Sequence, residues 1–107
     1  MSRFTIHDLA TIVDARAASN AEASYTRKLL DKGPEYCARK LGEEAVEAVI
    51  AGVANDRDGL IAESADLLFH LLVLLKSRGV TFGEVEAALA QRTNMSGLEE
   101  KAARKRD

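Results

Sequence analysis

The sequence predicts an all-α fold, and three observations indicate it. Alanine and leucine dominate the 107 residues, and both favour helix over strand. No stretch alternates polar and apolar residues with a period of two, as a half-buried strand would. Helix-breaking and helix-capping residues divide the chain into helical stretches. We therefore expect residues 1–107 to form one domain, a helical hairpin or bundle of four to five helices.

The first two helical stretches lie before residue 31. Thr5 can cap a helix that runs to about Ala18, because a threonine hydroxyl accepts a hydrogen bond from the first helical turn. The polar segment 19–24 then separates this helix from a short helical piece that runs through Leu30.

The second long helix is expected from about Pro34 to Ala54. Proline is tolerated in the first turn of a helix, where its missing N–H group would have no partner. Segment 54–59 forms a turn, since it is polar and ends in glycine. Three residues of this turn can cap the next helix: Asn55, Asp56 and Asp58.

The third helix is expected from about Leu60 to Ser77, ending at Arg78-Gly79. Its segment 67–75, LLFHLLVLL, is apolar nearly all round. A helix without a polar face must be covered on every side, and a 107-residue monomer can hardly provide that cover. We infer a homodimer that completes a four-helix-bundle core. The alternative is that the shorter helices wrap this segment within one chain.

The last helical stretches are marked by capping boxes. Thr81 with Glu84 forms the pattern T-x-x-E and opens a helix to about Gln91. Ser96 with Glu99 repeats the pattern before a short basic segment.

Composition excludes several classes of partner. The net charge of −2 gives no field that would recruit nucleic acid or an anionic membrane. The single cysteine, Cys37, rules out an internal disulfide and fits a reducing compartment. The N-terminal segment lacks an apolar signal core, and segment 67–75 is shorter than the roughly 20 residues that span a bilayer. We expect a cytoplasmic protein with neither nucleic-acid nor membrane partners.

Charged residues gather on one face of each long helix. At about 100° per residue, one face of the second long helix carries four of them: Lys40, Glu43, Glu44 and Glu47. On the third helix Glu63, Asp66 and His70 follow one another at i, i+3 and i+7 and again share a face. Because a short turn joins the helices, they lie antiparallel, and the acids of one can face those of the other.

Such facing acids predict a metal site. Two carboxylates about 4–5 Å apart repel by roughly 3–4 kcal/mol at an effective dielectric of 20, so either some are protonated or a divalent cation lies between them. Carboxylate oxygens, with no cysteine and no adjacent histidine pair, favour Mg²⁺, with Mn²⁺ as a possible substitute, over Zn²⁺. The expected ligands are Glu44, Glu47, Glu63 and Asp66. A magnesium ion held in this way would bind phosphates.

Other interpretations of these residues remain. A charge run usually forms a solvated helix face, but Glu63 and Asp66 lie inside an otherwise apolar helix, where unpaired charges are expensive. A di-iron bundle would need Glu-x-x-His on two helices, and the sequence has none there. His70 can be a core histidine, a residue that orients a ligand, or a base, and its apolar surroundings favour the first two.

The acidic pattern E-E-x-x-E followed by E-x-x-D resembles that of the MazG-like all-α nucleoside triphosphate pyrophosphatases. Within that group, four stretches of the chain look like the phosphoribosyl-ATP pyrophosphatase family: SYTRKLLDKG (24–33), KLGEEAVEAVIA (40–51), ESADLLFHLLVLL (63–75) and SGLEEKAARKR (96–106). The likeness covers most of residues 5–106 in the same order and spacing. It implies the MazG-like fold and hydrolysis of phosphoribosyl-ATP to phosphoribosyl-AMP and pyrophosphate, the second step of histidine biosynthesis. Phe69 stands where that family leads us to expect tyrosine.

The resemblance implies the same four metal ligands and a role for Glu43 in orienting or activating water. A carboxylate at Glu43 or Glu47 can accept the proton of the attacking water. Lys40 is the best candidate for stabilising the leaving pyrophosphate. Further substrate contacts are expected from six residues: Ser24, Tyr25, Thr26, Arg92, Lys101 and Arg104. The alternatives are a helix cap at residues 24–26 and a solvated surface for the basic tail.

Two other functions remain open. One is a housekeeping nucleoside triphosphate pyrophosphatase that uses the same acids on ordinary or damaged nucleotides. The other is a non-catalytic helical dimerisation module whose acids bind a partner. The sequence has no G-x-x-x-x-G-K-[ST] loop, so a P-loop enzyme is excluded.

Overall fold

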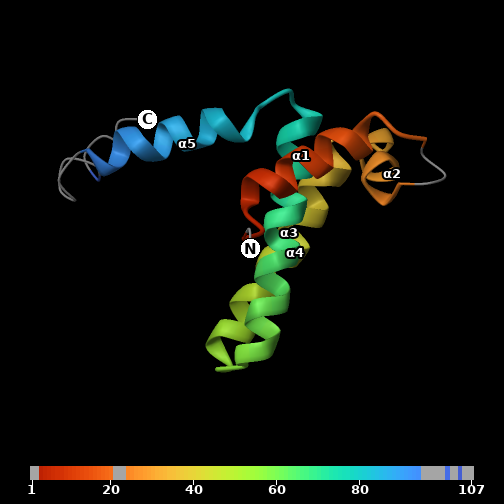
Figure 1. Ribbon diagram of the computed structural model, residues 1–107. Coiled ribbons are helices and arrows are strands. Elements are labelled where there is room, and N and C mark those ends of the chain that lie inside the picture. Colours follow the sequence, from red (N-terminus) through yellow and green to blue (C-terminus); the bar gives the residue numbers. More distant parts are fainter. Residues whose placement is uncertain (1–2, 21–23, 95–100, 102–103, 105–107) are drawn as a thin grey trace.

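The computed structural model consists of helices joined by short connections (Figure 1). It describes residues 3–20, 24–94, 101 and 104. The helices are α1 (Ile6–Ala17), α2 (Tyr25–Asp31), α3 (Pro34–Val53), α4 (Arg57–Ser77) and α5 (Phe82–Thr93). No strand occurs in these described ranges, and the predicted all-α class is confirmed.

The α3–α4 hairpin is the centre of the fold, and the contact between these two helices is the most extensive one. Asp56 caps α4, because its side chain accepts a hydrogen bond from the backbone N–H of Gly59 at 3.0 Å. Helix α4 therefore begins at Arg57, three residues before the predicted start at Leu60. Asp58 lies in its first turn, where a negative charge suits the helix dipole.

Capping boxes set the start of two other helices: the one at Thr81 and Glu84 was predicted, whereas at Thr5 only the cap itself was. Thr5 and Asp8 exchange hydrogen bonds at the start of α1. At the start of α5 the backbone N–H of Thr81 donates to Glu84 Oε2 at 2.8 Å, and Glu84 N–H donates to Thr81 Oγ1 at 3.2 Å. Helix α5 runs two residues past the predicted end. The cap predicted at Ser96 and Glu99 lies outside the described residues.

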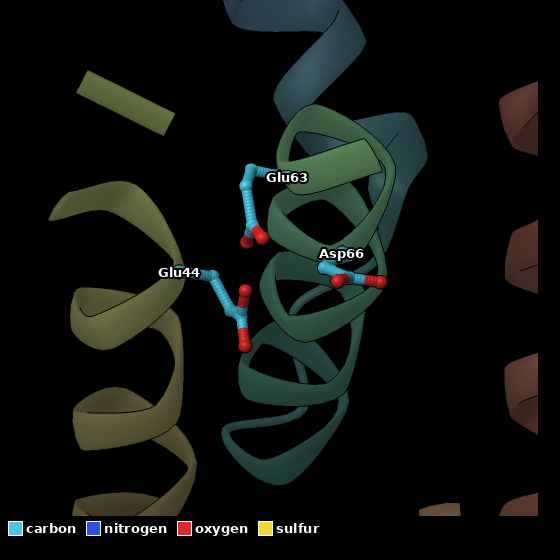
Figure 2. A group of neighbouring side chains, drawn as sticks. All are labelled: Glu44, Glu63 and Asp66. Carbon is cyan, nitrogen blue, oxygen red and sulfur yellow. The ribbon is translucent and has the colours of Figure 1, made fainter. Parts of the chain in front are cut away.

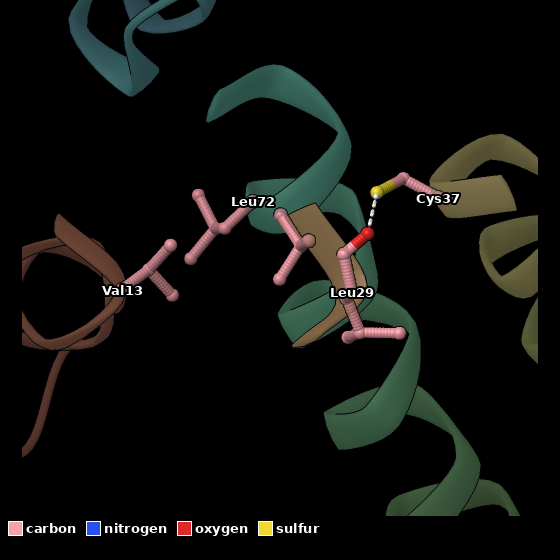
Figure 3. Packing of buried hydrophobic residues seen from close by; sticks show 5 residues of the cluster. Val13, Leu29, Cys37 and Leu72 are labelled. Carbon is pink, nitrogen blue, oxygen red and sulfur yellow. Dashed lines mark hydrogen bonds between the residues drawn. The ribbon is translucent and has the colours of Figure 1, made fainter. Parts of the chain in front are cut away.

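The buried core closes one end of the hairpin (Figure 3). It consists of Val13, Leu29, Cys37, Leu72 and Val73, which come from α1, α2, the first turn of α3 and the last third of α4. The Sγ–H of Cys37 donates to the carbonyl oxygen of Leu29 at 3.3 Å. This packing fixes α1 and α2 against one end of the hairpin and leaves the acidic faces of α3 and α4 free of a covering helix.

The other half of the hairpin extends beyond α1 and α2 (Figure 1) and exposes apolar side chains. Val49 is 64% and Val53 is 85% exposed. The remaining large apolar residues of the two helices that are exposed are Val46, Ile50, Leu60, Ile61 and Leu68. The Cα radius of gyration is 15.9 Å. A compact domain of this length would have about 13 Å. One chain therefore does not cover its own hairpin.

Within segment 67–75 itself, only Leu68 is exposed. The chain's own helices cover most of the run from which we inferred a dimer, as the alternative interpretation stated. The uncovered apolar surface lies instead along α3 and the first half of α4. The reason to expect a second chain is therefore this surface and not segment 67–75.

Helix α5 runs outward from the junction of α1 and α4 (Figure 1). His7 of α1 holds the first turns of α5. Its Nε2 lies 2.8 Å from Glu86 Oε2, and its ring makes an edge-to-face contact with Phe82, with ring centroids 5.6 Å apart.

None of the helices in the described ranges combines the length and apolarity needed to cross a bilayer.

Candidate metal centre

Three acids converge between α3 and α4. One carboxylate oxygen each of Glu44, Glu63 and Asp66 lies within 4.8 Å of the others. Figure 2 shows Glu44 reaching from α3 toward Glu63, with Asp66 about one turn further along α4. Oxygens that share one Mg²⁺ at about 2.1 Å lie no more than about 4.2 Å apart, so small side-chain rotations would bring all three onto one ion.

Glu47 stands beside this group rather than inside it. Its carboxyl is exposed, and it lies about one turn beyond Glu44 on α3. Hydrogen bonding to Glu47 and then to Glu44 raises the pKa of Glu63 to about 7, and burial and the two neighbouring charges add to the rise. The structure thus brings together three of the four predicted ligands and puts the fourth in contact with one of them.

Two oxygens of the group have no hydrogen-bond partner. Glu44 Oε2 and Glu63 Oε2 are both buried and both unpaired. Buried polar atoms in folded proteins are almost always paired, so each unpaired atom needs an explanation. Carboxylate oxygens that include two unpaired buried atoms, together with the raised pKa of Glu63, fit a hard divalent cation.

Lys40, one turn before Glu44 on α3, forms an ion pair with Glu43. Lys40 Nζ lies 3.3 Å from Glu43 Oε1, and this hydrogen bond raises the pKa of Lys40, so the ammonium stays charged at neutral pH. The Lys40 side chain is only 24% exposed. Glu43 is not among the three converging acids.

The three substrate contacts predicted at the start of α2 differ in exposure and in whether their hydroxyl groups are already hydrogen-bonded. The Ser24 hydroxyl caps α2 by accepting from Arg27 N–H at 3.1 Å, which is the alternative that the sequence left open. Thr26 is 1% exposed, and its hydroxyl oxygen has no partner. Tyr25 is exposed and stacks on Phe69 with ring centroids 6.3 Å apart.

His70 is buried beside the acids. Burial lowers the pKa of His70. The charge of Glu44 opposes this shift and that of Lys40 adds to it, and the net result is a ring that is neutral at pH 7. The His70 ring forms T-shaped contacts with the rings of Phe69 and Tyr25, with ring centroids 5.1 and 6.4 Å apart. Its Nδ1 has no hydrogen-bond partner. His70 is buried, as the interpretation of it as a core histidine predicted. Charged residues lie near it, however, so its surroundings are less apolar than the sequence suggested.

Of the predicted cations near the C-terminus, Arg92 is not brought to the acids within one chain. Arg92 lies on α5, which leads away from the hairpin (Figure 1). Lys101 and Arg104 are exposed and lie beyond α5.

Three residues near the start of α3 were not among the predicted site residues: Lys32, Tyr36 and Arg39. The ring of Tyr36 is in contact with the charged groups of Lys32 and Arg39. The spacing of Tyr36 and Lys40 at i and i+4 was the available signal, since it puts the ring on the acidic face.

An antiparallel helix pair that turns acids from both helices toward one another is the arrangement that the resemblance to the all-α nucleoside triphosphate pyrophosphatases led us to expect. Residues 6–93 match the family model described as phosphoribosyl-ATP pyrophosphohydrolase. The chain belongs to this family, and the resemblance predicted from its motifs is confirmed.

Curated relatives match the whole chain. It is 77% identical to phosphoribosyl-ATP pyrophosphatase 1 of Rhodopseudomonas palustris, with all of both chains covered. It is 75% identical to phosphoribosyl-ATP pyrophosphatase of Nitrobacter winogradskyi over all of this chain and 92% of that protein. It is 72% identical to phosphoribosyl-ATP pyrophosphatase 1 of Bradyrhizobium diazoefficiens over 98% and 99% of the two chains.

Proposed function

We propose that this chain hydrolyses phosphoribosyl-ATP between the α and β phosphates, releasing phosphoribosyl-AMP and pyrophosphate in the second step of histidine biosynthesis. Family membership and the names of its relatives support the substrate. The observation that carries the chemistry is the convergence of Glu44, Glu63 and Asp66 within 4.8 Å. An anhydride between two phosphates needs its negative charge neutralised before water can attack, and this group has the donor atoms to hold the neutralising ion.

The proposed ion is Mg²⁺, with Mn²⁺ as a substitute, held by Glu44, Glu47, Glu63 and Asp66. When bound, the ion would neutralise phosphate charge and polarise water. The two unpaired buried oxygens of Glu44 and Glu63 support this assignment, because a cation would satisfy both. Glu63 has to lose its proton to act as a ligand, since its pKa is about 7.

The remaining residues of the site have proposed roles of their own. Glu43 or Glu47 accepts the proton of the attacking water, and both carboxylates are exposed to the solvent that supplies it. Lys40 stabilises the charge that develops on the leaving pyrophosphate, because its ammonium is charged and only partly exposed. Six residues are proposed as further substrate contacts: Ser24, Tyr25, Thr26, Arg92, Lys101 and Arg104.

We also propose that residues 1–107 form one domain that works as a homodimer. The apolar side chains along α3 and the first half of α4 support the dimer, since exposed apolar patches of this kind mark interfaces. Arg92 lies far from its own acids, and a second copy is a way to bring such cations to the site. A cytoplasmic location fits the free thiol of Cys37 and a biosynthetic role.

The test is turnover by the purified chain. Phosphoribosyl-ATP and a panel of ordinary and damaged nucleoside triphosphates are compared with Mg²⁺ and with EDTA, and pyrophosphate release is measured. We expect Mg²⁺-dependent release with phosphoribosyl-ATP strongly preferred. Preference for another nucleotide would identify a housekeeping pyrophosphatase, and no release from any substrate would favour the non-catalytic module.

A further inference from the structure

A pair of cations flanks one aromatic ring at the start of α3. Lys32 Nζ lies 4.5 Å and Arg39 Cζ lies 4.9 Å from the centre of the Tyr36 ring. These residues and Glu35 line a surface hollow of about 420 Å³. Tyr36 is half-buried and packs against the core, whereas both cations are exposed. The ring is therefore a fixed support that holds both cationic groups at the rim of a hollow.

The hollow lies on the same side of α3 as the acids. Tyr36, Lys40 and Glu47 follow at i, i+4 and i+11, which is one helix face. Tyr36 precedes Glu44 by eight residues, which is about 12 Å along the axis. Lys40 lies between them on this face. A long ligand bound at the acids can reach the hollow along this face.

Two cations, Lys32 and Arg39, against one carboxylate, Glu35, leave the lining of the hollow with a net positive charge, which favours an anion. The ion pair of Arg39 with Glu43 is long, at 4.0 Å, and both side chains are at least half exposed, so it holds the guanidinium weakly. Arginine presents a planar fork of N–H donors that matches phosphate oxygens, and lysine adds a point charge. Because cations already occupy the ring, a phosphate is a better occupant than a stacked base.

We propose that Lys32 and Arg39, supported by Tyr36, bind the 5-phosphate of the ribose that distinguishes phosphoribosyl-ATP from ATP. This proposal rests on the proposed function. The substrate carries phosphate at both ends, and two sugars and a base separate the lone phosphate from the triphosphate. With the triphosphate at the acids, the lone phosphate meets the cations about 12 Å further along α3. The hollow then selects this substrate over ordinary nucleotides.

The test compares the affinities of two ligands by calorimetry in Mg²⁺ buffer. Phosphoribosyl-AMP carries the lone phosphate, and AMP lacks it. We expect wild-type protein to bind phosphoribosyl-AMP more tightly. Lys32→Gln and Arg39→Gln should each weaken that binding about tenfold while leaving AMP affinity within about twofold, since each removes a charge-assisted contact to one phosphate. The control Arg57→Gln removes the same charge at the opposite end of the hairpin and should change neither affinity.

Three outcomes overturn the proposal. The first is an equal loss of affinity for both ligands in the variants, which would assign the cations to the phosphate of the AMP portion. The second is variants that lose affinity for neither ligand, and the third is wild-type protein that binds phosphoribosyl-AMP no more tightly than AMP. Thermal unfolding of each variant checks that it is folded. Wild-type turnover of phosphoribosyl-ATP, measured alongside, tests the proposed function by itself. Its absence would refute that function, whereas turnover with unchanged affinities in the variants refutes the phosphate subsite alone.

Discussion

Glu44 on α3 and Glu63 on α4 face one another across the hairpin, and each has a buried carboxylate oxygen without a hydrogen-bond partner (Figure 2). Hydrogen bonding to Glu47 and then to Glu44 raises the pKa of Glu63 to about 7, and burial and charge repulsion by the same two acids add to the rise. The hairpin thus holds an arrangement that is unfavourable by itself and favourable with a cation. Perturbed acids of this kind are typical of functional sites.

Replacing one converging acid tests the centre directly. Glu44→Gln keeps the size of the side chain and removes its charge, so it should weaken the hold on the metal. Metal neutralisation of phosphate charge is worth several kcal/mol, so we expect kcat/KM to fall by about 100-fold or more. The measurement is Mg²⁺-dependent release of pyrophosphate from phosphoribosyl-ATP. Glu86→Gln, which removes a charge on α5, is the matched control and should keep near wild-type activity; equal rates in both variants would contradict the assignment.

The raised pKa of Glu63 predicts how stability depends on pH without metal. The folded pKa of about 7 exceeds the ordinary value of 4.5, so the fold favours the protonated carboxyl. This contribution is fully present below pH 4.5 and is lost as the pH rises through 7. In EDTA, the Tm of wild-type protein should therefore fall relative to that of Glu63→Gln across this range. Added Mg²⁺ should raise the wild-type Tm most at pH 8, and parallel Tm profiles in EDTA would count against the pKa shift.

Much of the site follows from local rules. The 3.6-residue period places Glu44 and Glu47 on one face, and the short turn capped by Asp56 makes the two long helices antiparallel. Helix α4 begins earlier than predicted because Asp56, rather than a later acid, supplies the cap. These features depend on residues close together in the sequence, so they can be predicted from it.

Other features depend on tertiary packing. The covering of segment 67–75 by the chain's own helices comes from how α1 and α2 dock, which no local pattern specifies. Lys32 belongs to the end of α2, and it meets Tyr36 because Gly33, at φ 93°, redirects the chain into α3. A helical wheel drawn for α3 does not include Lys32, so the wheel could not predict its contact with Tyr36. The outward course of α5 likewise separates Arg92 from the acids, which the sequence could not predict.

The exposed apolar face of the hairpin predicts a second copy of the chain. Val49→Asp puts a charge on α3 at a side chain that is 64% exposed, so it should not disturb the core of one chain. If this face forms the dimer, burying an unpaired charge there should shift the mass measured by light scattering at micromolar concentration from dimer to monomer. Phe4→Asp, at a residue 65% exposed outside the hairpin, is the control and should leave the mass unchanged. A monomeric wild-type protein would refute the dimer.

Lys40 should affect the chemical step more than substrate binding. Its ammonium lies between the acids and the start of α3 and is held by Glu43 at 3.3 Å. If it stabilises charge on the leaving pyrophosphate, its contact strengthens as the anhydride bond breaks. Lys40→Gln should then lower kcat by about 10²–10³-fold with a smaller change in KM, as expected for a lost charge-stabilising donor. Lys40→Arg should recover part of kcat, because the charge returns with different geometry. A rise in KM at constant kcat would instead show that Lys40 binds ground state and transition state equally.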